Sequence, residues 1–502
     1  MAQKRRKYST VNPFPDSQKF SIMTKQSASL LEVTRTLSNA AKAAHFHFGE
    51  DTAVVAVQHM LWQTVDLCEA LAALGARREN IFALGKIYSN SPVVIEVLRE
   101  LGVTVVQSSM PEPGQFARHF QTDVNLLWEL VAQHLARRSI KRILVLDDGG
   151  ACTTSIPPEL LRKYAVAGVE QTSFGMFLFE KQPPPFAVMS WARSAVKLQI
   201  GGPLFSQCLL ARLQSHVLGG DTLTGQNVGI IGLGSIGSSM AHLFERQDNN
   251  VVFYDPDQQL QIPDYLRGRV ARAGSLEELM LRCDYVFGCS GRNPFKDQWP
   301  LKYRPGIKLF SASGGDHEFR PIINDLKTRR GFYVTAFSWD IHSQNGPSGP
   351  ISIAYLGYPY NFVARDIEAV PTRVVQIETG GLLAGLMQAR SYLRFCEDGH
   401  MNSHGVHRIS PEAQRFVYET WLKVMNYQHI DLPLLYGCDP AILEAAHNRW
   451  WFVENSEPHP SLSYRPHHAT ETVMTRMIEG KSASEFGNQR KFEPDLCSLR
   501  NL

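Results

Sequence analysis

Short apolar runs alternate with longer amphipathic stretches from about residue 30 to residue 390. The short runs have the length of buried strands and include residues 52–57, 103–107, 142–146 and 251–254. The longer stretches carry apolar residues at three- and four-residue spacing, as helices do, and include residues 59–74, 92–101 and 124–136. This alternation predicts an α/β protein whose sheets are mainly parallel.

One predicted strand is followed by a glycine-rich turn and the start of a predicted helix. The apolar residues 228–231 lead into Gly232, Gly234 and Gly237, which are spaced as GxGxxG. The first glycine permits a tight turn, the second lets a diphosphate approach the backbone, and the third lets the helix pack against the strand. The free N–H groups of the first helical residues, Ser235 and Ile236 among them, would bind the diphosphate.

The next predicted strand, residues 251–254, ends in Asp255. An acid at this distance, roughly 20 residues after the glycines, binds the adenosine ribose hydroxyls of a dinucleotide. No arginine follows it directly, which favours NAD over NADP. The pattern therefore predicts a Rossmann domain with NAD as cofactor, and the alternative is a glycine turn in an α/β domain that binds no nucleotide.

The chain is long enough for two α/β domains with their own cores. The patterns predict a disordered tail, a substrate-binding domain, a Rossmann domain, a helical return to the first domain and a C-terminal extension of unknown role. These segments are residues 1–28, 29–200, 201–364, 365–400 and 401–502.

Composition narrows the classes of partner. The net charge is only +3, so neither nucleic acid nor a membrane is expected as a partner. No apolar run is long enough to span a bilayer. The eight cysteines are scattered without a CxxC pair, which is typical of a reducing compartment, and we expect a cytoplasmic protein.

Two histidine-containing segments are candidates for a metal or catalytic site. On a helix, His400, His404 and His407 would share one face and could bind a metal. Glycine and asparagine between them favour a loop, so no metal is predicted. The run 316–318 (Asp-His-Glu) is expected to order a loop rather than to assist chemistry.

Five further segments occur in the order and spacing seen in the S-adenosylhomocysteine hydrolase family, which the chain resembles over roughly residues 50–390. They are residues 59–64, 146–150, 168–175, 193–197 and 289–291. The resemblance implies a tightly held NAD that transiently oxidises a ribose 3′-hydroxyl. A base then removes the neighbouring C4′ proton, and the thioether leaves before water adds back.

The same resemblance implies residue roles. His59 and Asp148 would orient the sugar, and Lys197 would be the catalytic base. Further contacts to the cofactor would come from four residues, which are Thr172, Ser290, Gly291 and Asn361. A homo-oligomer is a further expectation from the family.

The chain departs from that family at several positions of the substrate site. Gln171 and Gly201 replace two carboxylates, and Gly314 and Val370 replace two histidines. When several residues act as a unit in catalysis, removing some of them lowers the reaction rate by orders of magnitude. We therefore expect a diverged substrate pocket beside a preserved cofactor site.

Three functions remain open from the sequence. The first is an NAD-binding relative of adenosylhomocysteinase that acts on a nucleoside or ribosyl thioether as its small-molecule substrate. The second is a non-catalytic protein that senses NAD or binds a partner. The third is a 2-hydroxy acid dehydrogenase-like oxidoreductase, which shares the glycine motif and the 254–256 Tyr-Asp-Pro run but for which no paired acid and histidine is evident after the last cofactor strands.

Overall fold

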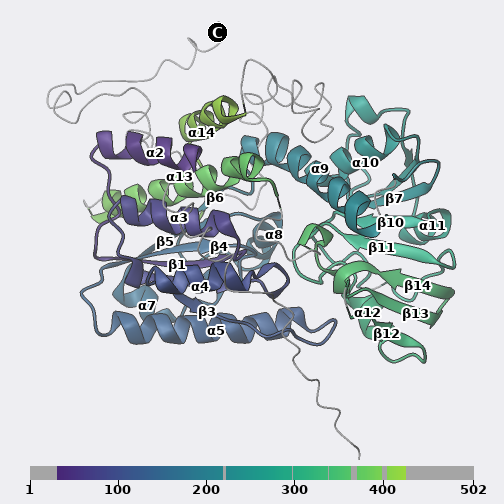
Figure 1. Ribbon diagram of the computed structural model, residues 1–502, viewed down its shortest axis with the longest axis horizontal. Helices are drawn as coiled ribbons and strands as arrows, with labels where there is room; N and C mark the ends of the chain where they lie inside the picture. Colours follow the sequence, from purple (N-terminus) through teal and green to yellow (C-terminus); the bar gives the residue numbers. More distant parts are fainter. Residues whose placement is uncertain are drawn as a thin grey trace, which may run out of the picture.

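Two α/β domains lie side by side and are bridged by helix α9 (Gly202–Arg212) in the computed structural model (Figure 1). The structure describes residues 31–218, 222–296, 298–336, 338–362, 370–397 and 404–425. The predicted tail 1–28 and most of the predicted extension 401–502 lie outside the described residues.

The first domain contains a seven-stranded sheet in the order β15-β6-β5-β4-β1-β2-β3, with every neighbouring pair parallel. Its strands are β1 (Thr52–Gln58), β2 (Ile81–Gly85), β3 (Thr104–Val106), β4 (Arg142–Asp147), β5 (Ala165–Glu170), β6 (Ala187–Ser190) and β15 (Gly405–Arg408). All of β1 is buried, as expected for a strand covered on both faces.

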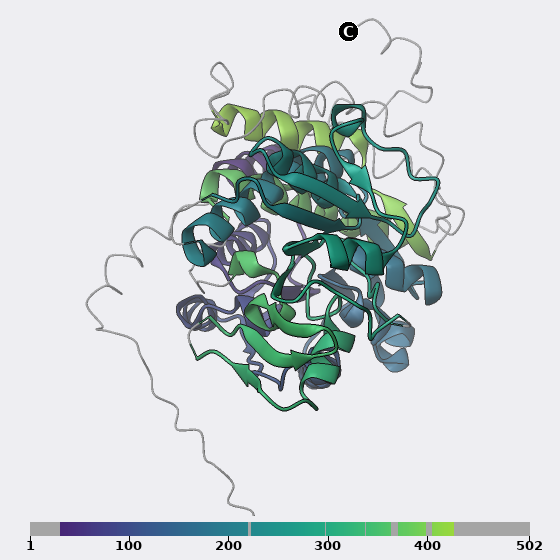
Figure 2. The same cartoon turned by 90° about the vertical axis from the view of Figure 1, so that its right-hand side faces the viewer.

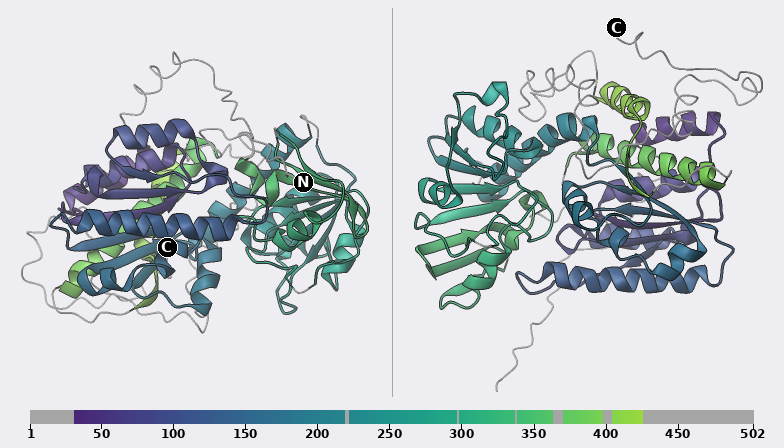
Figure 3. Two further views of the ribbon diagram at one scale, coloured as in Figure 1. Left: turned by 90° about the horizontal axis from the view of Figure 1, so that it is seen from below. Right: turned by 180° about the vertical axis from the view of Figure 1, so that it is seen from behind.

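Helices cover both faces of this sheet. They are α2 (Glu32–Ala43), α3 (Trp62–Ala73), α4 (Pro92–Glu100), α5 (Phe116–Leu135), α6 (Ala151–Thr154), α7 (Pro158–Lys163), α8 (Ser173–Lys181), α13 (Thr372–Glu397) and α14 (Pro411–Val424). Successive strand residues enter opposite cores: Val54 packs in the cluster with Leu386 of α13, whereas Val55 packs in the one with Trp128 of α5. Figure 3 shows α5 and α13 on opposite sides of the sheet.

The second domain contains an eight-stranded sheet in the order β12-β13-β14-β11-β10-β7-β8-β9. Its strands are β7 (Asn227–Ile231), β8 (Asn250–Tyr254), β9 (Ala271–Arg272), β10 (Tyr285–Gly288), β11 (Ile307–Ser311), β12 (Phe332–Val334), β13 (Ile341–Gly346) and β14 (Gly349–Ile353). The β12-β13-β14 part is antiparallel and the rest is parallel. Figure 2 shows this domain facing the viewer.

Three further helices belong to the second domain, namely α10 (Ser235–Glu245), α11 (Leu276–Arg282) and α12 (Arg320–Leu326). Helix α9 packs against α10 and so connects the bridge to the glycine motif. The predicted fold class, two α/β domains with mainly parallel sheets of which one is Rossmann-like, is confirmed.

The structure differs from the sequence prediction at the end of the first domain. Strand β15 pairs with β6, and α14 packs on α13 and α2, although both elements fall in the segment predicted as an extension. The four residues of β15 are too few for a strand to be recognised from its hydrophobic periodicity. Residues 173–181 form α8, whose residues Phe177 and Leu178 face the space between the domains.

Two other expectations about local structure change. The helix predicted to open at His59 begins at Trp62, which leaves His59 in the loop after β1. Strands β13 and β14 were not predicted, because half-exposed strands of mixed polarity give a weak period-two signal. Over the described ranges, every helix is too short or too polar to cross a membrane.

Candidate functional site

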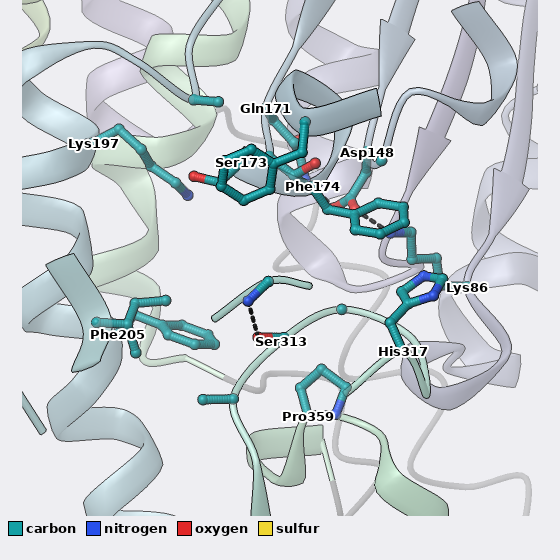
Figure 4. A pocket seen from close by; sticks show the side chains of 18 of the residues that line it. Lys86, Asp148, Gln171, Ser173, Phe174, Lys197, Phe205, Ser313, His317 and Pro359 are labelled. Atoms are coloured by element: carbon teal, nitrogen blue, oxygen red, sulfur yellow. Dashed lines mark hydrogen bonds and ion pairs between the residues drawn. The ribbon is translucent and has the colours of Figure 1, made fainter. Parts of the chain in front are cut away.

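A cavity of about 1110 Å³ lies between the two domains (Figure 4). The carboxyl ends of strands from both sheets open into it, with Lys86 following β2, Asp148 following β4, Gly232 following β7 and Cys289 following β10. Ligands of open parallel sheets bind at this end of the strands. The cavity is therefore the candidate site.

The three glycines of the motif occupy different surroundings. Gly232 has a φ of +90°, and a β-carbon there would lie 2.6 Å from the Ser290 Cα. A β-carbon on Gly237 would lie 1.8 Å from the Gly232 carbonyl oxygen. A β-carbon on Gly234 would meet no described atom within 4 Å. The first and third glycines thus permit close packing, and the second faces open space.

The start of α10 presents unpaired backbone donors to this open space. The described residues supply no side-chain cap for the helix, and its first residues Ser235, Ile236 and Gly237 cannot form N–H bonds within it. Nearby, the Asp255 carboxylate accepts a hydrogen bond from the Leu233 N–H at 2.8 Å and lines the cavity. An open cradle, free amides and an acid suit a dinucleotide.

Asn361, predicted as a cofactor contact, is buried and is not one of the residues that line the cavity. Its side chain is 1 % exposed, and neither its amide nitrogen nor its oxygen has a hydrogen-bond partner among the described residues. Its neighbour Phe362 lines the cavity.

Asp148 is the centre of a charged cluster in the first domain. Its carboxylate accepts hydrogen bonds from Lys86 and Gln171 and lies 3.3 Å from the His59 Nε2. The other ring nitrogen of His59, Nδ1, lies 2.6 Å from the Ser89 hydroxyl. The strand order explains why these side chains lie together, because β1, β2, β4 and β5 are neighbours in the sheet and their carboxyl ends align.

The cluster is ionic. Burial by itself would raise the pKa of Asp148, but Lys86 and His59 hold that pKa well below its usual range. Burial likewise opposes the charge on Lys86, and the Asp148 carboxylate overcomes it and raises the pKa of the amine. Both groups remain charged near neutral pH.

Two further carboxyl groups, those of Asp147 and Glu170, are buried next to this cluster. Burial raises the pKa of Asp147 to about 6, and burial with the nearby Asp147 raises the pKa of Glu170 well above its usual value. Glu170 accepts hydrogen bonds from the Gly149 N–H and from both the N–H and the hydroxyl of Thr172. Thr172, predicted as a cofactor contact, lines the cavity, but its N–H and hydroxyl both donate hydrogen bonds to Glu170.

Lys197 projects into the cavity from a different part of the first domain than Asp148 (Figure 4). Its partner is Glu378 of α13, whose Oε2 accepts from the Lys197 Nζ and from the Trp191 Nε1, each at 2.7 Å. A β-carbon on Gly201 would lie 2.4 Å from the Glu378 Oε1, so the glycine leaves room for this carboxylate. Sequence reasoning missed Glu378, which lies 181 positions after Lys197.

The turn after β10 is held by a buried acid. The N–H and hydroxyl of Ser290 each donate to Glu318 at 2.6 Å, and the Gly291 N–H donates to the Ser313 hydroxyl at 3.1 Å. Burial raises the pKa of Glu318 to about 7. Ser290 and Gly291 line the cavity beside the glycine loop, as Gly232 packs on Ser290.

The run 316–318 orders this region, as expected, and also reaches the cavity. Asp316 accepts from the Phe116 N–H and from Arg320. His317 stacks on Phe174 with ring centroids 4.1 Å apart and lines the cavity. Among His404, His407 and the other described residues, no set of three His, Cys, Asp or Glu side chains could hold a metal ion. His400 lies outside the described residues.

The site geometry and a family match together define a class of domain. Residues 210–294 match the NAD-binding domain of the D-isomer-specific 2-hydroxyacid dehydrogenases. The match includes the glycine loop, α10 and Asp255, and it confirms NAD as the cofactor of this fold. The chain thus carries an NAD-binding dehydrogenase-type domain.

The chain is also similar to uncharacterized proteins of two Mycobacterium tuberculosis strains, CDC 1551 and H37Rv. Each is 27% identical over 315 residues, which is 62% of this chain and 58% of the relative. The chain therefore matches somewhat more than half the length of these curated relatives.

The adenosylhomocysteinase family predicted from the sequence is wrong, because the family match is to 2-hydroxyacid dehydrogenases instead. The segments that carried the resemblance lie largely at strand ends and helix starts, such as the Asp147–Gly150 turn after β4. Parallel α/β sheets place small and acidic residues at such positions whatever reaction they support. The hydrolase activity that the resemblance implied is therefore not supported either.

Proposed function

We propose that this protein is an NAD-dependent oxidoreductase of the 2-hydroxy acid dehydrogenase type, which interconverts a hydroxyl and a carbonyl group on a small molecule. One observation carries the proposal. The glycine loop of an NAD-binding domain and two charged side-chain clusters line the same cavity. A reaction between cofactor and substrate needs this proximity.

The two clusters suit different tasks. Asp148 is surrounded by Lys86, His59 and Gln171, so it suits a role in orienting polar substrate groups. Both ring nitrogens of His59 are already engaged. Lys197 has a single described acceptor, Glu378, and its amine keeps donors for a ligand.

Lys197 is therefore the proposed proton-transfer group. NAD, when bound, supplies the nicotinamide that accepts or returns the hydride. During carbonyl reduction the substrate carbon gains the hydride, and its oxygen gains a proton from the Lys197 ammonium. Alcohol oxidation reverses both transfers. Glu378 holds the Lys197 Nζ toward the cavity, and a positioned acid–base group of this kind contributes about 10²–10⁴ in rate.

The test has two stages. Calorimetric titration with NAD comes first, followed by NADH oxidation with a panel of 2-keto acids and NAD reduction with the matching hydroxy acids. We expect Lys197→Ala to lower kcat by about 100-fold or more with NAD affinity unchanged. Lys42→Ala, at an exposed position of α2, is the matched control.

The outcomes separate the candidate functions. NAD binding without turnover of any panel member would contradict the proposal and favour a non-catalytic NAD-sensing protein. Turnover that survives in Lys197→Ala would remove the assigned role of Lys197. A Glu378→Gln variant should lower kcat more than it changes KM, because Glu378 acts through Lys197 and not on substrate.

A further inference from the structure

Two arginines from different domains meet on one aromatic ring at the cavity wall. Arg193 follows β6 in the first domain, and Arg292 follows β10 in the second. Their guanidinium carbons lie 5.3 Å and 3.8 Å from the centroid of Phe177 on α8. All three residues line the cavity. Guanidinium groups stack on aromatic faces in this way and leave their N–H edges free for hydrogen bonds.

The charges around this ring do not balance. The side chain of Arg193 has no hydrogen bond or ion pair with any residue that the structure describes. The carboxylate nearest to Arg292 is that of Glu180, at 3.9 Å. Burial and the neighbouring Arg292 lower the pKa of Arg193, while Glu180 acts in the opposite direction. A partly buried guanidinium with unused donors costs free energy that an anion would recover.

We propose that Arg193 and Arg292 form an oxyanion-binding subsite that takes a carboxylate or phosphate group across the domain interface. Phe177 provides the surface on which the two guanidinium planes rest. Bidentate hydrogen bonds from guanidinium to such groups are among the strongest in proteins. Because each arginine belongs to a different domain, the bound anion also ties the domains together.

Two ligands could bring this anion. Arg292 follows Ser290, which packs on Gly232, so a diphosphate bound at the glycine loop would be one source. Arg193 precedes Lys197 by four positions, so a substrate carboxylate is the second source. The second source rests on the proposed function, whereas the oxyanion subsite does not depend on it.

The experiment compares Arg193→Gln and Arg292→Gln with wild type, and Arg162→Gln on exposed α7 is the matched control. The probes are NAD, inorganic pyrophosphate, and oxalate added to NAD-saturated protein, each measured by calorimetric titration. Thermal unfolding without ligand is measured for all variants. A diphosphate source predicts about 10-fold or greater loss of NAD and pyrophosphate affinity in both variants.

A substrate-carboxylate source instead predicts NAD affinity within about twofold of wild type and about 10-fold weaker oxalate binding. In either case Arg193→Gln should keep or raise the ligand-free Tm, because it removes an unpaired cation. A purely structural arginine would show a lower Tm and unchanged affinities. Affinities within twofold of wild type for every probe, or a wild type that binds none of them, would overturn the subsite.

These outcomes are independent of turnover. Loss of anion binding in the arginine variants supports the subsite even if no hydroxy acid is ever oxidised. Conversely, active enzyme with unchanged affinities in both variants keeps the proposed function and removes the subsite.

Discussion

The two walls of the cavity are built by different means. The cofactor wall consists of backbone: a positive-φ glycine, a helix start without a side-chain cap among the described residues, and a glycine facing open space. The proposed substrate wall consists of side chains, with Lys86, Asp148 and His59 in one cluster and Lys197 with Glu378 in another. The backbone wall lies within 24 consecutive positions from Gly232 to Asp255, whereas Lys197 and Glu378 are 181 positions apart.

This difference explains why the sequence predicted the cofactor wall better than the other wall. A phosphate cradle requires glycine where a β-carbon would collide with backbone, as at Gly232 and Gly237, or would fill the space of the diphosphate, as at Gly234. Its residues are therefore tied to a local pattern. A side-chain cluster requires only that opposite charges arrive at the same sheet edge. Many residue combinations satisfy that condition, and so fold-level likeness misled the family prediction while the cofactor prediction was confirmed.

The largest expected effect comes from Asp148→Asn in the substrate wall. It leaves Lys86, which is buried, without its carboxylate, and such uncompensated charges cost about 3–5 kcal/mol of unfolding free energy. Asp147→Asn changes the adjacent carboxyl, which forms no ion pair with a described residue and whose pKa burial raises to about 6. Denaturant unfolding of both should show a cost below about 1 kcal/mol for Asp147→Asn. Equal losses would show that the ion pair is not the source.

The next effect tests the cofactor wall. In Gly237→Ala the new β-carbon meets the Gly232 carbonyl oxygen, so we expect about 3 kcal/mol of destabilisation and lost NAD binding. Gly234→Ala meets nothing within 4 Å and should fold like wild type, yet weaken NAD about 10-fold by filling the cradle. Thermal unfolding and NAD titration check both. Full NAD affinity in Gly234→Ala would contradict a diphosphate at this glycine.

A third effect is the pH dependence that Glu318 adds beside the cofactor wall. Burial raises its pKa to about 7, so the folded state binds the proton more tightly than the unfolded state. This contribution is fully present below about pH 4.5 and is lost as the pH rises toward 7, by up to about 3 kcal/mol. Glu318→Gln should flatten that part of the stability profile. Superimposable profiles of unfolding free energy against pH would contradict the assignment.

The smallest effect sharpens the link between Gly201 and Glu378. Gly201→Ala adds a β-carbon 2.4 Å from the Glu378 Oε1, which must move and so loosen its bond to Lys197. Because a flexible carboxylate can yield, stability should change by about 1 kcal/mol or less, while kcat falls about 10-fold. Steady-state kinetics check this, with Lys42→Ala at an exposed position of α2 as the comparison. Unchanged kcat would show that the pairing is not used.

The sequence by itself determined the α/β class, the Rossmann-like domain that contains Gly232 to Gly237, and NAD as the cofactor. These follow from local rules of period, turn sterics and helix-end donors, which neighbouring residues satisfy without help from the rest of the chain. It also brought His59 and Asp148 forward as candidates, and the sheet order placed them in contact.

Only the tertiary structure decided what surrounds those residues. It pairs Lys197 with Glu378 and Lys86 with Asp148. It also stacks Arg193 and Arg292 on the ring of Phe177 and adds β15 to the first sheet. These contacts join positions far apart in the chain through strand order and domain packing. No local pattern encodes such a meeting, because the energy of each contact depends on a partner that the fold alone supplies.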